Sequence, residues 1–306
     1  MKNGTLTVFG LSGQSIFMTV DEFHKPEETK TASSIYIEAG GKGHNQAVAA
    51  RRQGVSVNFV AAYGRDEFAK YAISQLAKDE VTVYPIYKDG MSAYATILID
   101  KNGNNQVTVY QGVNSLLTVE DVLPYEELIK NSEMVLLQFE MPLAVVKQII
   151  AMANKHDVLV MLNPAPLIKA TDLGKIDIIT PNEHEQAILS QAELDVRNVI
   201  ITKGGKGVSV KTIDEEYDVS ALAVKAVDTT GAGDVFNGSL AAYLLKGMSL
   251  REATQTACIA AGLSVCKAHV IASIPYFEDV ENIKKVNRWN EQKWNWSISE
   301  KAKCIL

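Results

Sequence analysis

The stretch VDTTGAGDVFNG, residues 227–238, places small residues and a carboxylate directly ahead of an apolar pattern of helical period. Gly231, Ala232 and Gly233 leave backbone N–H groups bare at the expected helix N-terminus, where unpaired donors and the helix dipole favour an anion. Asp234 follows at once, and its charge would repel a phosphate-sized ligand. Either no anion binds and Asp234 only complements the dipole, or Asp234 has a chemical role beside a phosphate.

Length, composition and charge limit the partners of the chain. The 306 residues are 47% hydrophobic and 22% charged, which is ordinary for a globular protein. The net charge of −6 argues against nucleic acids and acidic membranes, so we expect small-molecule partners. Three cysteines in no zinc pattern suit a reducing compartment. Because we find no signal peptide and no apolar run of membrane-spanning length, we expect a cytoplasmic protein.

Short apolar runs alternate with longer amphipathic segments, which predicts a parallel sheet covered by helices on both faces. The expected buried strands are LTVFG, VNFVAAYG, MVLLQFE, VLVMLNP, IDIITPN and NVIITKGG. The expected helices are HNQAVAARRQ, DEFAKYAISQLAKDE, LAVVKQIIAMANKH and DVFNGSLAAYLLKG. Two further segments have period two: TASSIYIEAG, and ATILIDKNGNNQVTVYQG with a hairpin turn at Asn102-Gly103. We assign these strands to a separate small β-sheet lid.

Several common motifs of catalysis and nucleotide binding are missing. The glycine-rich stretches AGGKGHNQ and KGGKGV do not match the P-loop, and FGLSGQS does not match the dinucleotide fingerprint. No serine lies in G-x-S-x-G, and the five histidines show no HExxH spacing. P-loop, Rossmann, hydrolase and metalloenzyme interpretations therefore have no support.

The remaining motifs occur in a fixed order along the chain. They are GGKGHNQAVAA (40–50), LQFE (137–140), NPAP (163–166), TPNEHE (180–185), ITKGGKG (201–207) and VDTTGAGDVFNG (227–238). In this order they resemble the ribokinase-like, or PfkB-type, sugar kinases over almost the whole chain. The resemblance implies one ribokinase-like α/β domain over residues 1–306, a three-layer fold with a mostly parallel central sheet. Residues of about 13–40 and 93–112 would contribute the β-sheet lid.

The resemblance offers an answer to the question that Asp234 raises. It implies an ATP-dependent sugar kinase that moves the γ-phosphoryl group to a hydroxymethyl of a sugar or sugar-like acceptor, with Mg²⁺. The amides of Gly231, Ala232 and Gly233 would form the anion hole, and Asp234 would remove the proton of the acceptor hydroxyl as general base. A carboxylate is then tolerated beside phosphate because it is the base.

Other roles carry over by position. The implied acceptor-binding residues are Gly13, Ser15, Gly41, Lys42, Gly43, Asn45 and Glu140. The implied nucleotide-side residues are Asn182, Glu185, Thr202, Gly204, Gly207 and Cys258, with Asn182 and Glu185 organising magnesium and its waters. The implied monovalent-cation site is formed around Asp228, Thr230 and Ser273. Simpler interpretations remain open: Asn182 and Glu185 as a helix cap and a solvated acid, Lys42 as a surface lysine, and Glu140 as a partner for backbone donors.

The chain also departs from the family pattern. Gly13 and Ser15 stand where ribokinase has an asparagine and an aspartate that anchor sugar hydroxyls, so we expect poor ribose binding and a bulkier or anionic acceptor. Cys258 stands where relatives commonly carry Asn or His. His269 replaces a glycine beside the cation site, which predicts a changed loop path and weak or absent potassium activation. The chain between TPNEHE and VIITKGG is shorter and should lack a helix.

Two rival functions and an assembly are also considered. A nucleoside kinase of the same fold would need aromatic stacking residues in the lid, for which Tyr36 and Phe17 are candidates. A non-catalytic ligand sensor would not need Asp234. The few lid strands cannot bury their faces alone, so we expect a homodimer formed through the lid. The tail from Val280, with its three tryptophans, should pack as a helix or strap.

Overall fold

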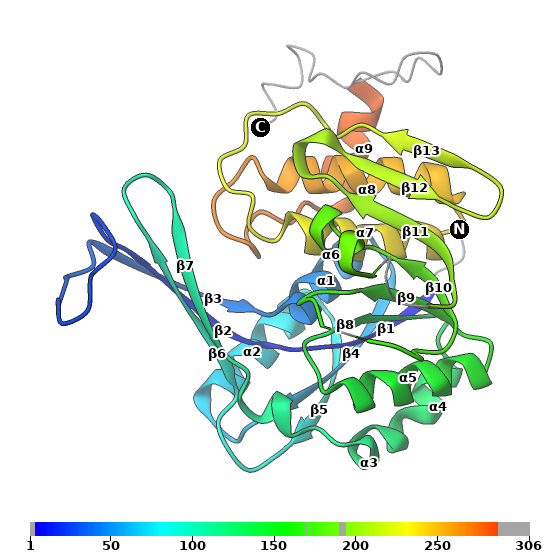
Figure 1. Ribbon diagram of the computed structural model, residues 1–306, viewed down its shortest axis with the longest axis horizontal. Helices are drawn as coiled ribbons and strands as arrows, with labels where there is room; N and C mark the ends of the chain where they lie inside the picture. The colour runs from blue at the N-terminus through cyan, green and yellow to red at the C-terminus, as the bar shows by residue number, and fades with distance from the viewer. Residues whose placement is uncertain (1–3, 169, 190–193, 287–306) are drawn as a thin grey trace.

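A mostly parallel sheet forms the middle layer of the protein (Figure 1). The computed structural model describes residues 4–168, 170–189 and 194–286. Within this part of the chain, the strand order is β13-β12-β11-β10-β9-β8-β1-β4-β5, and only β11/β12 and β12/β13 are antiparallel. The strands are β1 Thr5–Phe9, β4 Ser56–Tyr63, β5 Thr82–Tyr87, β8 Met134–Gln138, β9 Leu159–Asn163, β10 Ile176–Ile179, β11 Val196–Thr202, β12 Val208–Lys211 and β13 Glu216–Val219.

Helices cover both faces of this sheet. They are α1 Lys42–Arg52, α2 Glu67–Lys78, α3 Val119–Val122, α4 Glu126–Lys130, α5 Leu143–Lys155, α6 Glu183–Leu189, α7 Ala232–Leu245, α8 Leu250–Ser264 and α9 Phe277–Val286. Successive strand side chains point to opposite faces, so Leu6 and Val8 join the core under α1, α2, α7, α8 and α9, whereas Phe9 joins the core under α3, α4 and α5. The expected α/β sandwich is confirmed.

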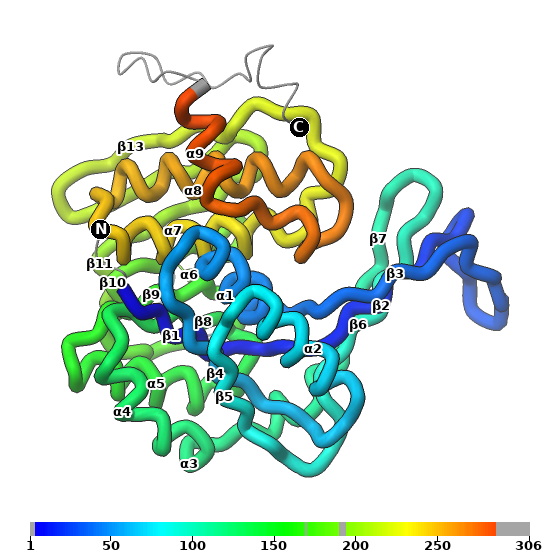
Figure 2. The backbone as a smooth tube through the Cα atoms, turned by 180° about the vertical axis from the view of Figure 1, so that it is seen from behind, coloured from blue at the N-terminus to red at the C-terminus, as the bar shows by residue number. Residues whose placement is uncertain are grey.

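A second, smaller sheet projects from one side of the body (Figure 2). Its order is β3-β2-β6-β7, with β2 Gly13–Thr19, β3 Ser34–Gly40, β6 Ala93–Ile99 and β7 Asn105–Tyr110. The β2/β6 pair is parallel and the other two pairs are antiparallel. The β6–β7 connection turns at Asn102-Gly103, as expected, with Gly103 at a positive φ of 81°. We call this sheet the lid.

The six expected central strands and four expected helices are all present. The expectations did not include β5 at one edge of the sheet, or β12 and β13, which are short and extend the other edge in antiparallel pairs. They also omitted the short helices α3 and α4, and α8, whose buried side chains surround most of the helix and weaken its period. The tail continues as α9 to Val286, whereas Trp289, Trp294 and Trp296 lie outside the described residues. Part of the shortened segment, 190–193, also lies outside them. No helix of the described chain could span a membrane.

Candidate active site

Two cavities meet at the N-terminus of α7. The first, of about 280 Å³, lies between the lid and the start of α1, and Thr230, Gly231 and Asp234 line it. The second, of about 460 Å³, lies between the end of β11 and α8, and Thr229, Ala232 and Gly233 line it. The Gly-Ala-Gly turn is therefore a wall that both cavities share. We call them the lid cavity and the β11–α8 cavity.

The turn itself is built to expose backbone donors. Gly231 is the N-cap of α7 in the left-handed conformation (φ 76°), and a Cβ there would lie 2.4 Å from Cγ1 of Val270. In the described chain no side chain caps α7, and a Cβ on Gly233 would meet no atom within 4 Å. Open space therefore faces the uncapped helix terminus, as an anion site requires.

Asp234 is buried, and amides hold both of its oxygens. Asn45 Nδ2 donates to Oδ2 at 2.9 Å, and Gln46 Nε2 donates to Oδ1 at 2.9 Å. Gln46 in turn accepts at Oε1 from Nε2 of the buried Gln138, at 2.7 Å. Since α1 packs directly on α7, these residues from two helices and a strand end fix the carboxylate at the wall of the lid cavity.

The sequence analysis did not assign roles to Gln46 and Gln138. Both lie inside quoted motifs, GGKGHNQAVAA and LQFE. The available signal was the polar run His44, Asn45 and Gln46 directly ahead of the apolar run AVAA in one motif.

Lys42 and Glu140 meet on the other side of the lid cavity. The Lys42 backbone N–H donates to Glu140 Oε2 at 2.9 Å, and both residues line the cavity. Burial raises the pKa of Glu140 to about 7; the Lys42 charge opposes this rise and Asp234 adds to it. The Asp234 charge is the main cause of a raised Lys42 pKa. Glu140 does serve as a partner for a backbone donor, but Lys42 is no ordinary surface lysine.

The expected acceptor glycines have different roles. Gly41 lines the lid cavity at a φ of 103°, a conformation that other residues rarely adopt. Gly43 does not line either cavity; its Cα lies 2.7 Å from the position of a Cβ on Gly10, so it allows close packing of α1 on β1. A direct contact of Gly43 with the acceptor stays a prediction, and the structure gives Gly43 a packing role.

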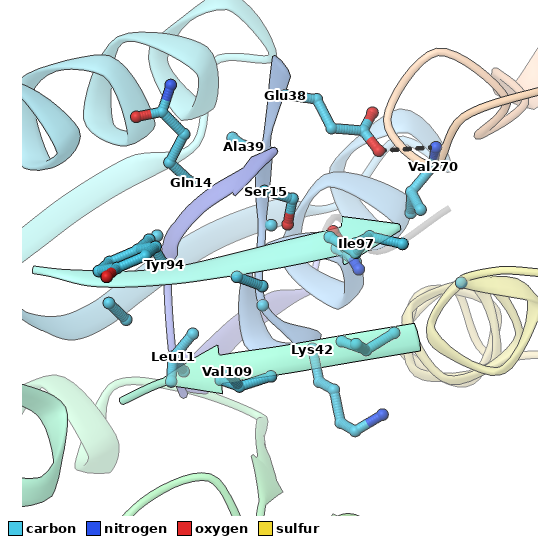
Figure 3. Close-up of a pocket in the computed structure, with 18 of the residues that line it drawn as sticks. Leu11, Gln14, Ser15, Glu38, Ala39, Lys42, Tyr94, Ile97, Val109 and Val270 are labelled. Atoms are coloured by element: carbon cyan, nitrogen blue, oxygen red, sulfur yellow. Dashed lines mark hydrogen bonds between the residues drawn. The ribbon is translucent and has the colours of Figure 1, made fainter. Parts of the chain in front are cut away.

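Gly13 and Ser15 both line the lid cavity, but Gly13 leaves less room than expected. Figure 3 shows Ser15 among the residues of the cavity wall. A Cβ on Gly13 would lie 2.1 Å from the Ala93 carbonyl oxygen, so β6 already occupies that space. Ser15 pairs across β2/β3 with Glu38, whose carboxylate also lines the cavity. Three acidic residues, Glu38, Glu140 and Asp234, line the cavity against one basic residue, Lys42, which weakens the expectation of an acidic acceptor.

On the nucleotide side, Asn182 and Glu185 cap α6. The Asn182 N–H donates to Glu185 Oε2 and the Glu185 N–H donates to Asn182 Oδ1, both at 2.8 Å. Glu185 is buried, so it is not the solvated acid of the simpler interpretation.

The β11–α8 cavity has a mostly apolar wall. The expected residues that line it are Asn182, Thr202, Gly204, Gly207 and Cys258. Burial raises the pKa of the Cys258 thiol to about 12, so the thiol is neutral near pH 7.

The expected cation-site residues lie around the segment 266–273 that follows α8. Asp228 accepts from the N–H groups of Thr230 (2.9 Å) and His269 (3.2 Å), and Ser273 donates to the Val270 carbonyl (2.9 Å). His269 has a φ of 70°, so it adopts the left-handed conformation that glycine would supply. The expectation that His269 changes the loop path for lack of this freedom is wrong, and the physical reason for weak potassium activation is removed.

The aromatic residues considered for base stacking contact His269 instead. The Tyr36 ring stacks on the His269 ring with centroids 3.5 Å apart, and the Phe17 ring lies 6.4 Å from it. One face of Tyr36 is thus already covered.

Comparison with known proteins identifies the family. The model of the pfkB family carbohydrate kinases matches residues 5–276. The chain belongs to the pfkB family of carbohydrate kinases. This kinase is 36% identical to the ribokinase of Haemophilus influenzae over 291 residues, which are 89% of this chain and 95% of that protein. It is 31% identical to the deoxyribokinase of Salmonella typhi, over 92% of this chain and 99% of that protein.

Solved structures of kinases have the same fold. The ribokinase of Thermotoga maritima matches with a TM-score of 0.85 and 32% identity, over 92% of this kinase and 99% of that chain. The Arabidopsis thaliana ribokinase, solved with ribose and ATP, matches with a TM-score of 0.82 and 27% identity, over 91% and 98%. The chain is a carbohydrate kinase, which transfers a phosphoryl group to an alcohol, and its ribokinase-like fold is confirmed.

Proposed function

We propose that this kinase transfers the γ-phosphoryl group of ATP to a hydroxymethyl of an uncharged sugar, with Asp234 as general base. The observation that carries the proposal is the shared wall: Asp234 faces the lid cavity while Gly233 faces the β11–α8 cavity, one residue apart on α7. A sugar in the first cavity and ATP in the second would meet at the uncapped helix terminus.

The proposed reaction follows from these positions. Asp234 accepts the proton of the sugar hydroxyl as its oxygen forms the new bond to the γ-phosphorus. The bond from that phosphorus to the bridging oxygen breaks, and ADP leaves with the electron pair. The N–H groups at the start of α7 stabilise the phosphoryl charge, because the open space at Gly233 lets the phosphoryl oxygens approach them.

The charged groups around the wall have supporting roles in this proposal. Lys42, whose raised pKa keeps it protonated, would neutralise phosphoryl charge, and Glu140 would accept a hydrogen bond from the sugar. The amide of Asn182 and the buried carboxylate of Glu185 are oxygen groups of the kind that Mg²⁺ and its waters prefer, so this pair fits a magnesium site. When bound, Mg²⁺ would offset the charge of the triphosphate.

The lid wall favours a sugar with few hydroxyls on that side. One row of side chains runs across β2, β6 and β7 and consists of Ser15, Ala95 and Val109. This row therefore offers the sugar a single hydroxyl. A neutral serine bond in place of a charge-assisted one would weaken ribose binding by ~1–3 kcal/mol relative to a pocket with a carboxylate there. Ribose should therefore be a poorer substrate than a neutral sugar that has no hydroxyl facing this row of lid side chains.

We further propose a homodimer through the outer face of the lid. Ile35 and Ile37 alternate with Tyr36 and Glu38 on β3, and Glu38 lines the lid cavity, so the two isoleucines point to the opposite face. Both are exposed, Ile35 by 63%, and their partners on β2 are Met18 and Ile16. A second copy would cover this apolar strip.

The experiment that tests the proposed function is a measurement of ADP release from ATP and Mg²⁺ with a panel of acceptors. The panel contains ribose, deoxyribose, larger neutral sugars, sugar acids and nucleosides. We expect the highest kcat/KM with a neutral sugar other than ribose. The highest kcat/KM with a sugar acid or a nucleoside, or no release with any acceptor, would contradict the proposal.

A further inference from the structure

The lid is tied directly to the segment that packs on the anion hole. Glu38 on β3 is only 4% exposed; its Oε1 accepts from the Val270 N–H at 3.0 Å and its Oε2 from the Ile271 N–H at 3.1 Å (Figure 3). The preceding N–H, of His269, donates to Asp228 at 3.2 Å. Two carboxylates thus hold three consecutive amides of one loop, one carboxylate from the lid and one from the approach to α7.

A second contact joins the same two elements. Tyr36 lies two residues before Glu38, on the same face of β3, and its ring stacks on the His269 ring with an interplanar angle of 20°. Phe17, the cross-strand partner of Tyr36, also approaches the His269 ring. The two lid strands nearest the loop, β2 and β3, therefore both contact it through the ring of His269. The backbone of His269 has the left-handed conformation.

The held loop in turn sets the position of the anion hole. The Val270 side chain packs so closely on Gly231 that a Cβ at residue 231 would lie 2.4 Å from it. The N–H of Val270 thus binds the lid, and the side chain of Val270 packs on Gly231, the N-cap of α7. Asp228 reinforces the connection, because its other oxygen accepts from the Thr230 N–H, next to Gly231.

We infer that Glu38 is a positioning residue for phosphoryl transfer: it latches the lid, through the loop 269–271, to the Gly-Ala-Gly turn. Glu38 sits opposite Ser15 at the acceptor wall, so the seating of the lid on a sugar and the placement of the anion hole depend on one carboxylate. A displacement of the anion hole by about 1 Å can lower the rate of phosphoryl transfer on the order of 10²-fold. The contact of Glu38 with the loop therefore affects the rate. This inference rests on the proposed function.

The test compares Glu38→Gln with Glu22→Gln. Gln keeps the size of Glu38 but replaces one acceptor oxygen by an NH₂ group, which cannot accept from the loop. Glu22 is the control because it is an exposed carboxylate on the β2–β3 connection whose ion-pair partner is Lys30 rather than the loop 269–271. We expect Glu38→Gln to lower kcat at least about 10-fold at saturating sugar and ATP, with the sugar KM changed less than about threefold, and Glu22→Gln to change neither.

Hydrogen exchange of the loop 266–273 provides a readout that does not depend on activity. We expect faster exchange at Val270 and Ile271 in Glu38→Gln and wild-type exchange in Glu22→Gln. A rise in sugar KM with kcat unchanged would show that Glu38 only contacts the sugar, and an unchanged kcat with faster exchange would show that the latch does not position the hole. Either result overturns the inference. Absence of turnover in the wild-type protein contradicts the proposed function instead.

Discussion

At the scale of single residues, two side-chain amides from α1 hold the buried carboxylate of Asp234: Asn45 donates to Oδ2 and Gln46 donates to Oδ1. Asp234 and the glycines of the turn were predictable because their types and spacing fit an anion site beside a base, whereas Asn45 followed only from the family resemblance. Gln46 and Glu38 were not predictable, because their partners lie 188 and 232 residues away in the chain. Only the packing of α1 on α7 and the β3 register bring these groups together.

Gln46 provides the first prediction. Gln46→Leu removes the donor that orients Asp234 Oδ1 and leaves the Gln138 amide without its acceptor, so kcat should fall by about 10–100-fold. The control is Gln53→Leu, at the C-cap of α1. The buried Gln53 amide donates to the Pro275 carbonyl and accepts from the Tyr243 hydroxyl. Gln53→Leu should lower stability but keep the kcat of the folded protein. Equal losses of kcat in the two variants would show that Gln46 has no special link to Asp234.

His44 provides a prediction on pH. Its ring is fully buried, Nδ1 contacts Ser12 Oγ at 2.9 Å, and burial lowers its pKa to about 3. Because its ordinary value is 6.5, the unfolded chain binds the proton first, so stability is present above pH 6.5 and is lost as the pH falls toward 3. Urea unfolding at pH 7.5 and 5.5 should show a loss for the wild type that exceeds that of His44→Gln by about 1 kcal/mol. The same loss in both proteins would exclude His44 as the cause.

At the scale of elements, alternation and helical period predicted the six central strands and four helices named above, but not how closely these elements approach one another. Gly238 lies where α7 crosses α1, and a Cβ there would lie 2.3 Å from the Gln46 carbonyl oxygen. Period alone does not distinguish this glycine from Gly233, five residues earlier, where a Cβ would meet nothing within 4 Å. The difference depends on helix packing, which sequence does not display.

This pair of glycines gives a matched prediction. Gly238→Ala should destabilise the protein by about 1–3 kcal/mol, because the added methyl pushes the two helices apart. Gly233→Ala should keep the wild-type melting temperature but lower kcat at least about 10-fold, because its methyl occupies the space proposed for the phosphoryl group. Thermal unfolding and steady-state kinetics separate the two effects. A stable Gly238→Ala protein would refute the packing argument, and a fully active Gly233→Ala protein would refute the anion hole.

At the scale of the whole molecule, period-two segments interrupting α/β units predicted a separate lid sheet, and the structure contains it. The parallel β2/β6 pair and the contact of the lid with the loop after α8 could not be predicted, because register between distant segments has no signal in a single sequence. On the outer face of the lid, Ile35 and Ile37 are exposed.

The proposed homodimer is tested on that outer face. Ile35→Lys adds a charge to the exposed strip, so a dimer formed there should dissociate to monomers by light scattering at micromolar concentration. Ile213→Lys is the control, because Ile213 is also exposed but follows β12, outside the lid. A monomeric wild type, or a dimer that survives Ile35→Lys, would reject the lid interface.

The central claim is that Asp234 is the base at the wall between two ligand cavities. Its most direct test is ADP release by Asp234→Asn at saturating ATP and the best sugar of the panel, together with ATP binding by calorimetry. Asn keeps the shape and the backbone donors but cannot take the proton, so kcat should fall at least ~10²-fold while ATP affinity stays nearly unchanged. Turnover within a few-fold of the wild type would contradict the account.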